Sequence, residues 1–458
     1  MPTVTVPWGQ ETFSLELPRD WTVQQTAQPQ APPASEDWPD VLARALNRPE
    51  GTPPLEELLA ERRHGRVAII VEDLTRHSPL ESILRVVLRE LAHARIGPEN
   101  VELVFATGMH PPMSADQAAS KVGRELATSF PWRCNPWRDR DAHAYLGEVR
   151  DGAGSVEVWV DRGVASADLR ILIGSVSPHL QAGFGGGYKL LVPGCAHLQT
   201  IRQLHLSGVP RRAIQQVGQP PGANRMRRLI DAAGSAVDAR AGVSFGIQYL
   251  LDASDRPAAI AAGDVAACHR MLVKKCAAAY GVLIDAPADV VIANAHPRDH
   301  DLWQSFKAIA HACWALRDNG VLICLARCPG QANMPTRSLP LPPLWVRRGI
   351  RLLGADTLAS LLTRLVPALA GDAAFFVRLA LRILQRHTVL MVSPALVQGG
   401  VKLAGLPLYS DPADAVAVAD KLLPPGPKRV TVFPAGGVTY PIRRPRPVSS
   451  RPATGAGG

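Results

Sequence analysis

Short apolar runs alternate with longer amphipathic segments along this chain, and the alternation occurs twice. Buried strands are expected at Arg66–Asp73, Val101–Ala106 and Leu169–Val176, and the segment between the first two has apolar residues at helical spacing. The alternation restarts near Ala288 with ADVVIANA, and the apolar runs GVLICLA, HTVLMVSP and RVTVFPAG follow. Strands that alternate with helices form mainly parallel sheets, because each helix returns the chain to the same end of the sheet. The sequence therefore predicts an α/β protein with two domains.

Domain boundaries follow from this restart. A chain of 458 residues is longer than one hydrophobic core usually serves. We predict an N-terminal cofactor-binding domain over 1–274, which includes the early strands VTVPW and ETFSLELP, and a C-terminal α/β domain over 275–442. The basic tail over 443–458, RRPRPVSSRPATGAGG, has too few apolar groups to bury a core and is expected to be disordered.

The charge and the cysteines restrict the class of protein. The formal net charge of +10 comes largely from isolated arginines and from the tail, without a basic groove interleaved with aromatic residues. The charge therefore favours anionic substrates and cofactors over nucleic acid. No run of about eighteen uncharged apolar residues and no signal region occur, so a cytoplasmic protein without a membrane partner is expected. Seven cysteines, an odd number, are expected to be reduced thiols.

A polar cluster follows the first expected strand of the α/β pattern. Asp73, Thr75 and Arg76 lie in the stretch EDLTRHSP, which opens a helix. A guanidinium group and the free N–H groups of a helix start both attract an anion. The alternative is that Asp73 or Ser78 is an ordinary helix cap.

Gln304 and Lys307 lie three residues apart at the start of another expected helix. This spacing places both side chains on one helix face. Together they could hold a carboxylate or a phosphate, although an exposed helix turn with these residue types is also common.

The densest glycine segment, HLQAGFGGGYK, directly follows the third expected strand. Its glycines, which include Gly186 and Gly187, permit positive φ angles or a close approach of the backbone to a ligand. The spacing fits neither common phosphate-binding motif. Lys189 ends the segment and is either a phosphate clamp or an amine for covalent attachment, which burial would favour by lowering its pKa. The segment predicts a cofactor or anion site, with a purely structural turn as the alternative.

Three histidines accompany these motifs. His110 lies on a loop after the second strand, His179 precedes the glycines, and His205 follows Lys189 by sixteen residues on an expected helix. Imidazole is a good ligand for nickel, zinc or copper, but a single histidine is more often an ordinary polar residue. Cys324 and Cys328 have the spacing of half a metal site without a second pair, and we interpret them as incidental.

Taken together, these segments resemble the nickel-pincer-nucleotide-dependent lactate racemase family of 2-hydroxy acid racemases and epimerases. The resemblance rests on DLTR at 73–76, ATGMHPPM at 106–113, P-H-x4-F-x-G-G-x-K at 178–189, LVPG at 191–194, His205 and QSFK at 304–307. These motifs occur in the family's order across most of the chain. The chain departs from the family pattern in several places: Tyr188 replaces a smaller residue beside Lys189, Trp303 replaces a tyrosine, and the stretches CNPWRDRD and RCPGQANMP also differ. The substrate pocket is therefore expected to differ in shape.

The resemblance implies an active-site cleft between the two domains and a nickel pincer nucleotide, pyridinium-3-thioamide-5-thiocarboxylic acid mononucleotide. It implies that Lys189 carries the cofactor and that His205 binds the nickel. The implied cofactor-binding residues are Lys189, Asp73, Thr75, Arg76, Gly186, Gly187, Gln304 and Lys307. The implied substrate-binding residues are Arg76, Trp303, Gln304 and Lys307.

The resemblance also implies a reaction. A hydride would leave Cα of a small 2-hydroxy acid for the cofactor, while His110 or His179 takes the hydroxyl proton, one histidine for each enantiomer. Separate machinery would synthesise the cofactor, and the oligomeric state stays open. Two alternatives are a lyase or aldolase that forms a Schiff base at Lys189, and a non-catalytic protein that binds an anionic metabolite.

Overall fold

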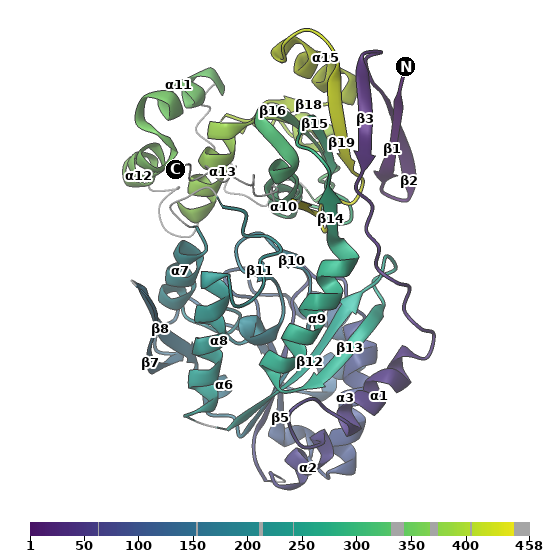
Figure 1. Ribbon diagram of the computed structural model, residues 1–458. Coiled ribbons are helices and arrows are strands. Elements are labelled where there is room, and N and C mark those ends of the chain that lie inside the picture. Colours follow the sequence, from purple (N-terminus) through teal and green to yellow (C-terminus); the bar gives the residue numbers. More distant parts are fainter. Residues whose placement is uncertain are drawn as a thin grey trace, which may run out of the picture.

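A computed structural model describes residues 1–443 apart from 63, 153, 210–213, 241, 331–342, 367–373 and 404. The chain forms two lobes (Figure 1), with α1 to α9 in one and α10 to α15 in the other. The predicted disordered tail lies outside the described residues except for Arg443. Both lobes contain strands and helices, as the alternating pattern predicts.

The first lobe is built on a six-stranded sheet with the order β13-β12-β9-β4-β5-β6. The strands are β4 Val67–Val71, β5 Val101–Phe105, β6 Trp132–Cys134, β9 Leu169–Ser175, β12 Val243–Leu251 and β13 Pro257–Gly263. Neighbouring strands are parallel except for the pair β12 and β13. The three strands expected from the sequence are confirmed.

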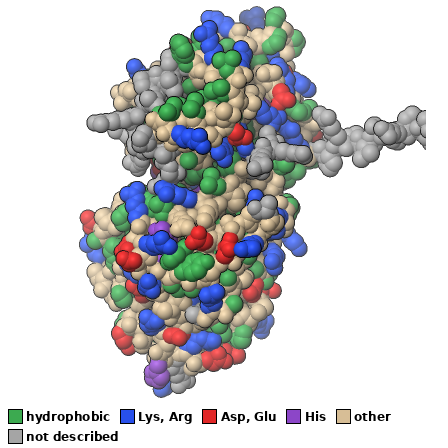
Figure 2. Space-filling model, turned by 90° about the vertical axis from the view of Figure 1, so that its left-hand side faces the viewer, with side chains coloured by type: hydrophobic (Ala, Val, Ile, Leu, Met, Phe, Trp, Pro, Cys, Tyr) green, Lys and Arg blue, Asp and Glu red, His purple; other side chains and the backbone are tan. Residues whose placement is uncertain are grey.

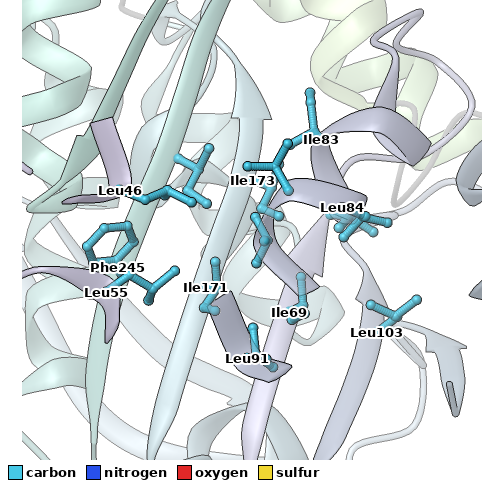
Figure 3. Packing of buried hydrophobic residues seen from close by; sticks show 14 of the residues in the cluster. Leu46, Leu55, Ile69, Ile83, Leu84, Leu91, Leu103, Ile171, Ile173 and Phe245 are labelled. Atoms are coloured by element: carbon cyan, nitrogen blue, oxygen red, sulfur yellow. The ribbon is translucent and has the colours of Figure 1, made fainter. Parts of the chain in front are cut away.

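The core of this lobe explains why β4 is so apolar. All five of its residues are buried, because helices cover both faces of the sheet. Ile69 and Ile171 of neighbouring strands pack against Leu91 of α3, Leu80–His93 (Figure 3). The opposite face packs against α7, Leu198–Ser207, and α8, Arg225–Asp238. The sheet is therefore rigidly held where its loops carry the predicted site.

The second lobe contains another six-stranded sheet, with the order β18-β17-β16-β15-β19-β3. Its strands are β3 Trp21–Thr26, β15 Ala288–Asn294, β16 Leu316–Leu325, β17 Thr388–Val392, β18 Leu408–Tyr409 and β19 Lys428–Phe433. Every neighbouring pair is parallel. The expected restart of the α/β pattern near Ala288 is confirmed.

The start of the chain differs from the sequence prediction, which assigned residues 1–274 to one domain. Strand β3 pairs with β19 of the second lobe, and the hairpin of β1, Thr3–Trp8, and β2, Glu11–Glu16, packs on the same sheet. Trp21 is 1% exposed and donates a hydrogen bond to Asp420 at 3.0 Å. The predicted boundary at 274 falls inside α9, Val265–Tyr280. Local patterns identify a strand but do not reveal which sheet it joins.

The other elements complete the two lobes. The helices are α1 Trp38–Asn47, α2 Leu55–Ala60, α4 Ala115–Val122, α5 Arg124–Ser129, α6 Arg162–Ala165, α10 Leu302–Ala312, α11 Pro343–Leu353, α12 Ala355–Leu365, α13 Ala374–Arg386, α14 Pro394–Gln398 and α15 Pro412–Leu422. The strands are β7 His143–Asp151, β8 Gly154–Asp161, β10 Pro178–His179, β11 Gly183–Phe184, β14 Gly281–Ile284 and β20 Tyr440–Arg443. Short 3-10 turns lie at Pro98–Asn100, Gly187–Leu190 and Cys313–Ala315.

The surface and the thiols agree with the sequence analysis. Figure 2 shows Lys and Arg side chains spread over both lobes of one face, with acidic and hydrophobic side chains among them. All seven cysteines are free thiols, as predicted. Within the described ranges, no helix is long and apolar enough to cross a membrane.

The position of β3 generates a prediction about stability. Trp21→Ala should lower the free energy of unfolding by about 3–5 kcal/mol, because it leaves a cavity in the second lobe and an unpaired Asp420. Urea denaturation measures the change. Trp345→Ala is the matched control, since Trp345 is 64% exposed and its loss should change stability by less than about 0.5 kcal/mol. Equal stabilities for the two variants would contradict the assigned pairing.

Candidate functional site

The predicted site residues follow three neighbouring parallel strands of the first lobe. Asp73 comes after β4, His110 after β5 and His179 after β9. Ligands usually bind beyond the carboxyl ends of such strands. Strands β10 and β11, which carry His179 and the glycine segment, lie toward the second lobe (Figure 1).

Asp73 and His110 form a hydrogen-bonded pair. Asp73 is 5% exposed, accepts from His110 Nδ1, and also accepts from the Thr75 amide at 3.0 Å and the Thr75 hydroxyl. Burial acts to raise the pKa of Asp73, but the bonds from His110 and Thr75 and the charge of Arg76 outweigh it and lower the pKa. The ionised carboxylate orients the ring, so the Nε2 lone pair of His110 is available to accept a proton.

The helix-cap alternative for this segment is excluded. Helix α3 has Pro79 at its N-cap position and no side-chain capping bond. The Ser78 hydroxyl instead donates to Glu72, which also accepts from the Ser175 amide at 2.8 Å and from Tyr249 at 3.1 Å. Glu72 is a buried carboxylate that sequence analysis missed, and it ties β4, β9 and β12 together beneath the site.

His179 has the opposite arrangement to His110. Its Nδ1 accepts from the backbone amides of Gln181 at 3.2 Å and Ala182 at 3.1 Å. Burial, followed by the charges of Lys189 and Lys307, lowers the pKa of His179 well below its usual value. A neutral ring that accepts at Nδ1 carries its proton on Nε2. His179 therefore presents a hydrogen-bond donor where His110 presents a lone pair.

The glycine segment has a structural explanation. Gly186 and Gly187 have φ angles of 78° and 64°. A Cβ on Gly187 would lie 3.0 Å from the ring of His269, and one on Gly186 would lie 2.8 Å from Val176. The Gly187 amide donates to the side-chain oxygen of Gln248 at 2.8 Å. Tight packing and positive φ angles therefore account for these glycines without a bound ligand.

Three buried side chains that sequence analysis missed fix this segment. Arg227 of α8 donates to the Phe184 carbonyl and, at 3.2 Å, to the Gly186 carbonyl, while His269 contacts the Gly185 carbonyl at 2.9 Å. Gln248 of β12 is the third. No local signal identifies them, because they approach the loop from distant parts of the sequence.

Tyr188 does not reshape the pocket as expected. Its ring is 5% exposed and lies against Gly234 of α8, and its hydroxyl donates to Asp238 at 2.6 Å. The side chain therefore anchors the glycine segment to the core of the first lobe.

Lys189 lies half-buried at the end of this segment. Burial, followed by the positive charges of Arg76 and Arg227, lowers its pKa to about 7. No ion pair to its amine is formed within the described part of the chain. A neutral amine is nucleophilic, so the environment suits covalent attachment better than a permanent charge clamp.

His205 lies on α7 close enough for Lys189 and His110 to influence it. Burial, followed by the charges of these two residues, lowers the pKa of His205 to about 3. Its Nδ1 is buried and has no hydrogen-bond partner. The ring stacks on Phe375 with centroids 4.6 Å apart and an interplanar angle of 7°. A neutral imidazole with a free nitrogen and a fixed ring fits a metal ligand.

The second lobe contributes Gln304 and Lys307 from α10. Asp301 caps this helix by accepting from the Gln304 amide at 2.8 Å, and Lys307 donates to the side-chain oxygen of Gln304. Burial, followed by the charges of Arg76, Arg298 and Lys189, lowers the pKa of Lys307 well below its usual value. The predicted shared face is confirmed, and it lies beside Arg76 and Lys189 of the first lobe.

An aromatic cluster adjoins these side chains. Trp303 meets Phe376 with ring centroids 4.1 Å apart, and Phe375 links Phe376 to His205 across the two lobes. The sequence does not single out these phenylalanines, because α13 shows only an amphipathic pattern.

Thiol ligands play no part in the cluster. Cys324 and Cys328 are buried in the core of the second lobe, where Cys328 lies 3.5 Å from the Ser305 hydroxyl. Among the residues with described positions, no three His, Cys, Asp or Glu side chains gather to hold a metal ion.

Comparison with known proteins identifies relatives of this chain. The family model for the lactate racemase N-terminal domain matches residues 8–215. The lactate racemase of Thermoanaerobacterium thermosaccharolyticum is 27% identical over 336 residues, covering 72% of this chain and 75% of that protein. The lactate racemase of Lactiplantibacillus plantarum is 25% identical over 291 residues, covering 63% of this chain and 65% of that protein.

Solved structures share the fold. The lactate racemase apoprotein from Thermoanaerobacterium thermosaccharolyticum superposes with a TM-score of 0.79 and 22% identity, covering 97% of this chain and 100% of that one. A protein from Thermotoga maritima gives a TM-score of 0.62 and 16% identity, covering 91% and 100%. Fold and site define a two-lobed α/β protein with a lysine and histidine cluster to which both lobes contribute. The chain is similar to lactate racemases in sequence and in fold, and its class is that of an isomerase.

The hydrogen bonds of the two histidines generate a prediction about their tautomers. In the protein without cofactor, His110 should carry its proton on Nδ1, because it donates to Asp73, and His179 should carry its proton on Nε2. Nitrogen NMR of the labelled imidazoles measures both. Asp73→Asn should change the signals of His110 and leave those of His179 unaltered. The same tautomer in both rings would contradict the described geometry.

The lowered pKa of Lys189 generates a second prediction. Its pKa in the folded protein lies below that of a free lysine, so the neutral amine predominates above pH of about 7. Acylation of Lys189 by an amine reagent should therefore rise with a midpoint near pH 7, as measured by mass spectrometry of its peptide. Lys189→Met should lose this modification. A midpoint above pH 10 would show that the amine is not buried as described.

Proposed function

We propose that this protein is a racemase or epimerase of a small 2-hydroxy acid and that it works with a nickel pincer nucleotide attached to Lys189. One observation carries the proposal: Lys189, whose neutral amine is favoured near pH 7, lies in the same cluster as the unpartnered imidazole of His205. The two side chains supply an attachment point and a metal ligand. Similarity to lactate racemases supports the substrate class.

The residues of the cluster fit the proposed cofactor. Lys189 would hold it by its amine and His205 would bind the nickel, while Thr75 and Arg76 offer donors to its anionic groups. Gly186 and Gly187 would shape the backbone beside it. When bound, the nickel pincer nucleotide supplies an acceptor for the hydride of Cα.

Substrate binding would use both lobes. Arg76 from the first lobe and Gln304 with Lys307 from the second present donors that suit a carboxylate. Trp303, with the neighbouring phenylalanines, would exclude water from the reacting atoms. In this arrangement the carboxylate is fixed while C2 of the substrate reacts.

Proton transfer would use the two histidines. His110 accepts the hydroxyl proton at Nε2, and the ionised Asp73 stabilises the imidazolium that forms. His179 starts with its proton on Nε2 and donates a hydrogen bond to the oxygen on C2. To serve as the base for the other enantiomer, His179 must release that proton and weaken its contacts with the two amides. Each histidine therefore acts as the base for one enantiomer, and the two rings start with Nε2 in different protonation states.

The proposal also covers the source of the cofactor and the cellular compartment of the protein. Separate synthesis machinery would deliver the nucleotide, and the Lys189 amine would condense with one of its thiocarboxylic acid groups, with loss of water, to form the thioamide link. The protein works in the cytoplasm, where its seven free thiols stay reduced.

A second candidate function uses the same lysine. A pKa of about 7 also suits a Schiff base between Lys189 and a carbonyl substrate, as in a lyase or aldolase. Borohydride with a carbonyl substrate would then trap a covalent adduct at Lys189. The metal-ligand features of His205 have no use in that reaction.

Loading of the protein tests the cofactor. Protein made together with cofactor-synthesis machinery should show a mass adduct and about one nickel per chain. Lys189→Ala should lose both, because it removes the amine, whereas Lys421→Ala, on the exposed end of α15, should retain both. Intact mass and metal analysis provide the readout. An unmodified, nickel-free wild-type protein that still racemises would refute the mechanism.

Replacement of the bases tests their roles. His110→Asn and His179→Asn should each lower the exchange between enantiomers of the hydroxy acid by about 10²–10⁴-fold, because each removes a general acid/base. Chiral chromatography measures the exchange, and nickel content shows that loading is intact. His93→Asn, on the exposed end of α3, is the control. A near-normal rate in either test variant would reject the paired-base assignment.

A further inference from the structure

Arg298 is a buried cation without a partner. It lies on the loop between β15 and α10, its residue is 6% exposed, and its Nη1 has no hydrogen-bond partner. Across the described ranges its side chain forms no ion pair. The same loop shows the usual arrangement elsewhere, since Asp299 pairs with Arg327 through two contacts, one of 3.0 Å.

An unpaired buried guanidinium is energetically unfavourable. Its charge loses hydration and gains no compensating hydrogen bond. Protein interiors rarely contain such groups unless a ligand or a mechanism uses them. Arg298 is therefore placed for an anion that the protein itself does not provide.

A second side chain with an unpartnered nitrogen lies on the same loop. His300 contacts Asp301 through Nε2 at 3.0 Å, and its buried Nδ1 has no partner. Its ring lies 6.0 Å from the ring of His77, which belongs to the Arg76 loop of the first lobe. Arg298 thus extends the cationic site, on a loop whose His300 ring meets the Arg76 loop of the other lobe.

The neighbouring carboxylates do not neutralise Arg298. Glu72 is already bonded to Ser78, Ser175 and Tyr249. Asp255 lies 3.8 Å from His77 and influences Arg298 only at longer range. The amine of Lys121, on the same side, donates to the Arg76 carbonyl at 2.6 Å and adds positive charge.

The position of Arg298 relative to the other cations indicates the direction of the site. Its charge and that of Arg76 both influence Lys307. The groups that influence Lys189 and His205 include Arg76 and His110 but not Arg298. Arg298 therefore lies on the side of the cluster that includes Arg76 and Lys307.

We propose that Arg298 forms a second anion subsite that holds the distal carboxylate of a 2-hydroxy dicarboxylic acid. The inference rests on the proposed function and narrows its substrate class. Arg76, Gln304 and Lys307 bind the carboxylate beside the reacting carbon. A substrate with a second carboxylate two or three carbons away gives Arg298 the partner that a monocarboxylate leaves missing.

Binding to the protein without cofactor tests the subsite. In titration calorimetry, wild-type protein should bind malate at least tenfold more tightly than lactate. Arg298→Leu should remove this preference and leave lactate binding unchanged. Arg429→Leu is the matched control, because Arg429 belongs to the same lobe and pairs with Asp289. Equal affinities for the two acids in wild-type protein would overturn the inference.

Stability distinguishes a subsite from a structural arginine. Arg298→Leu and Arg298→Gln should unfold at the same temperature as the wild type or higher, because each removes an unpaired buried charge. A lower unfolding temperature for both variants would show that Arg298 supports the fold, and the inference would be wrong.

Cofactor loading distinguishes the two sources of an anion. If Arg298 instead holds the phosphate of the nucleotide, Arg298→Leu will lose nickel and the mass adduct, and the inference fails. Normal loading together with lost malate preference supports it. Loaded wild-type protein that racemises lactate and malate equally would overturn the inference and leave the proposed function intact. Loss of loading in Lys189→Ala is a separate result that bears only on the proposed function.

Discussion

Basic side chains gather where the two lobes meet, and their mutual repulsion is the constraint on which the site depends. Arg76, Lys189, Arg298 and Lys307 lie near one another, while the carboxylate among them, Asp73, is engaged by His110 and Thr75. Each cation lowers the tendency of its neighbours to hold a proton, and burial reinforces the effect. Such an arrangement lowers the stability of the protein alone and is relieved by anionic ligands. The attachment point, the substrate contacts and the proposed second subsite therefore all favour an anionic ligand.

A rigid scaffold makes this repulsion tolerable. The parallel strands β4, β5 and β9 place three loops at one edge, and helices on both faces bury the strands. Beneath the loops, Glu72 gathers donors from three elements, and Arg227 fixes the carbonyls of the glycine segment. Charged side chains stay close together because their backbones cannot move apart.

The two lobes have different roles in the proposed chemistry. The first lobe supplies Lys189, His205 and both histidine bases, and the second supplies donors and aromatic groups that complete the substrate side. Relatives share this architecture, with a TM-score of 0.79 to the lactate racemase apoprotein from Thermoanaerobacterium thermosaccharolyticum. In this arrangement, changes on the loop around Arg298 can alter the substrate while the attachment point in the other lobe is preserved.

The sequence by itself determined the α/β class and the strands that carry the site, and it predicted Asp73, His110, His179, Lys189 and His205 as site residues. These features have local signals, because the periodicity of apolar residues and the spacing of motifs depend only on residues close together in the sequence. Only the tertiary structure decided that β3 joins the second sheet, that Tyr188 faces α8, and that Arg227, Phe375 and Arg298 approach the site. Such contacts join residues far apart in the chain. The burial of a side chain, or its lack of a hydrogen-bond partner, is defined only once the chain has folded.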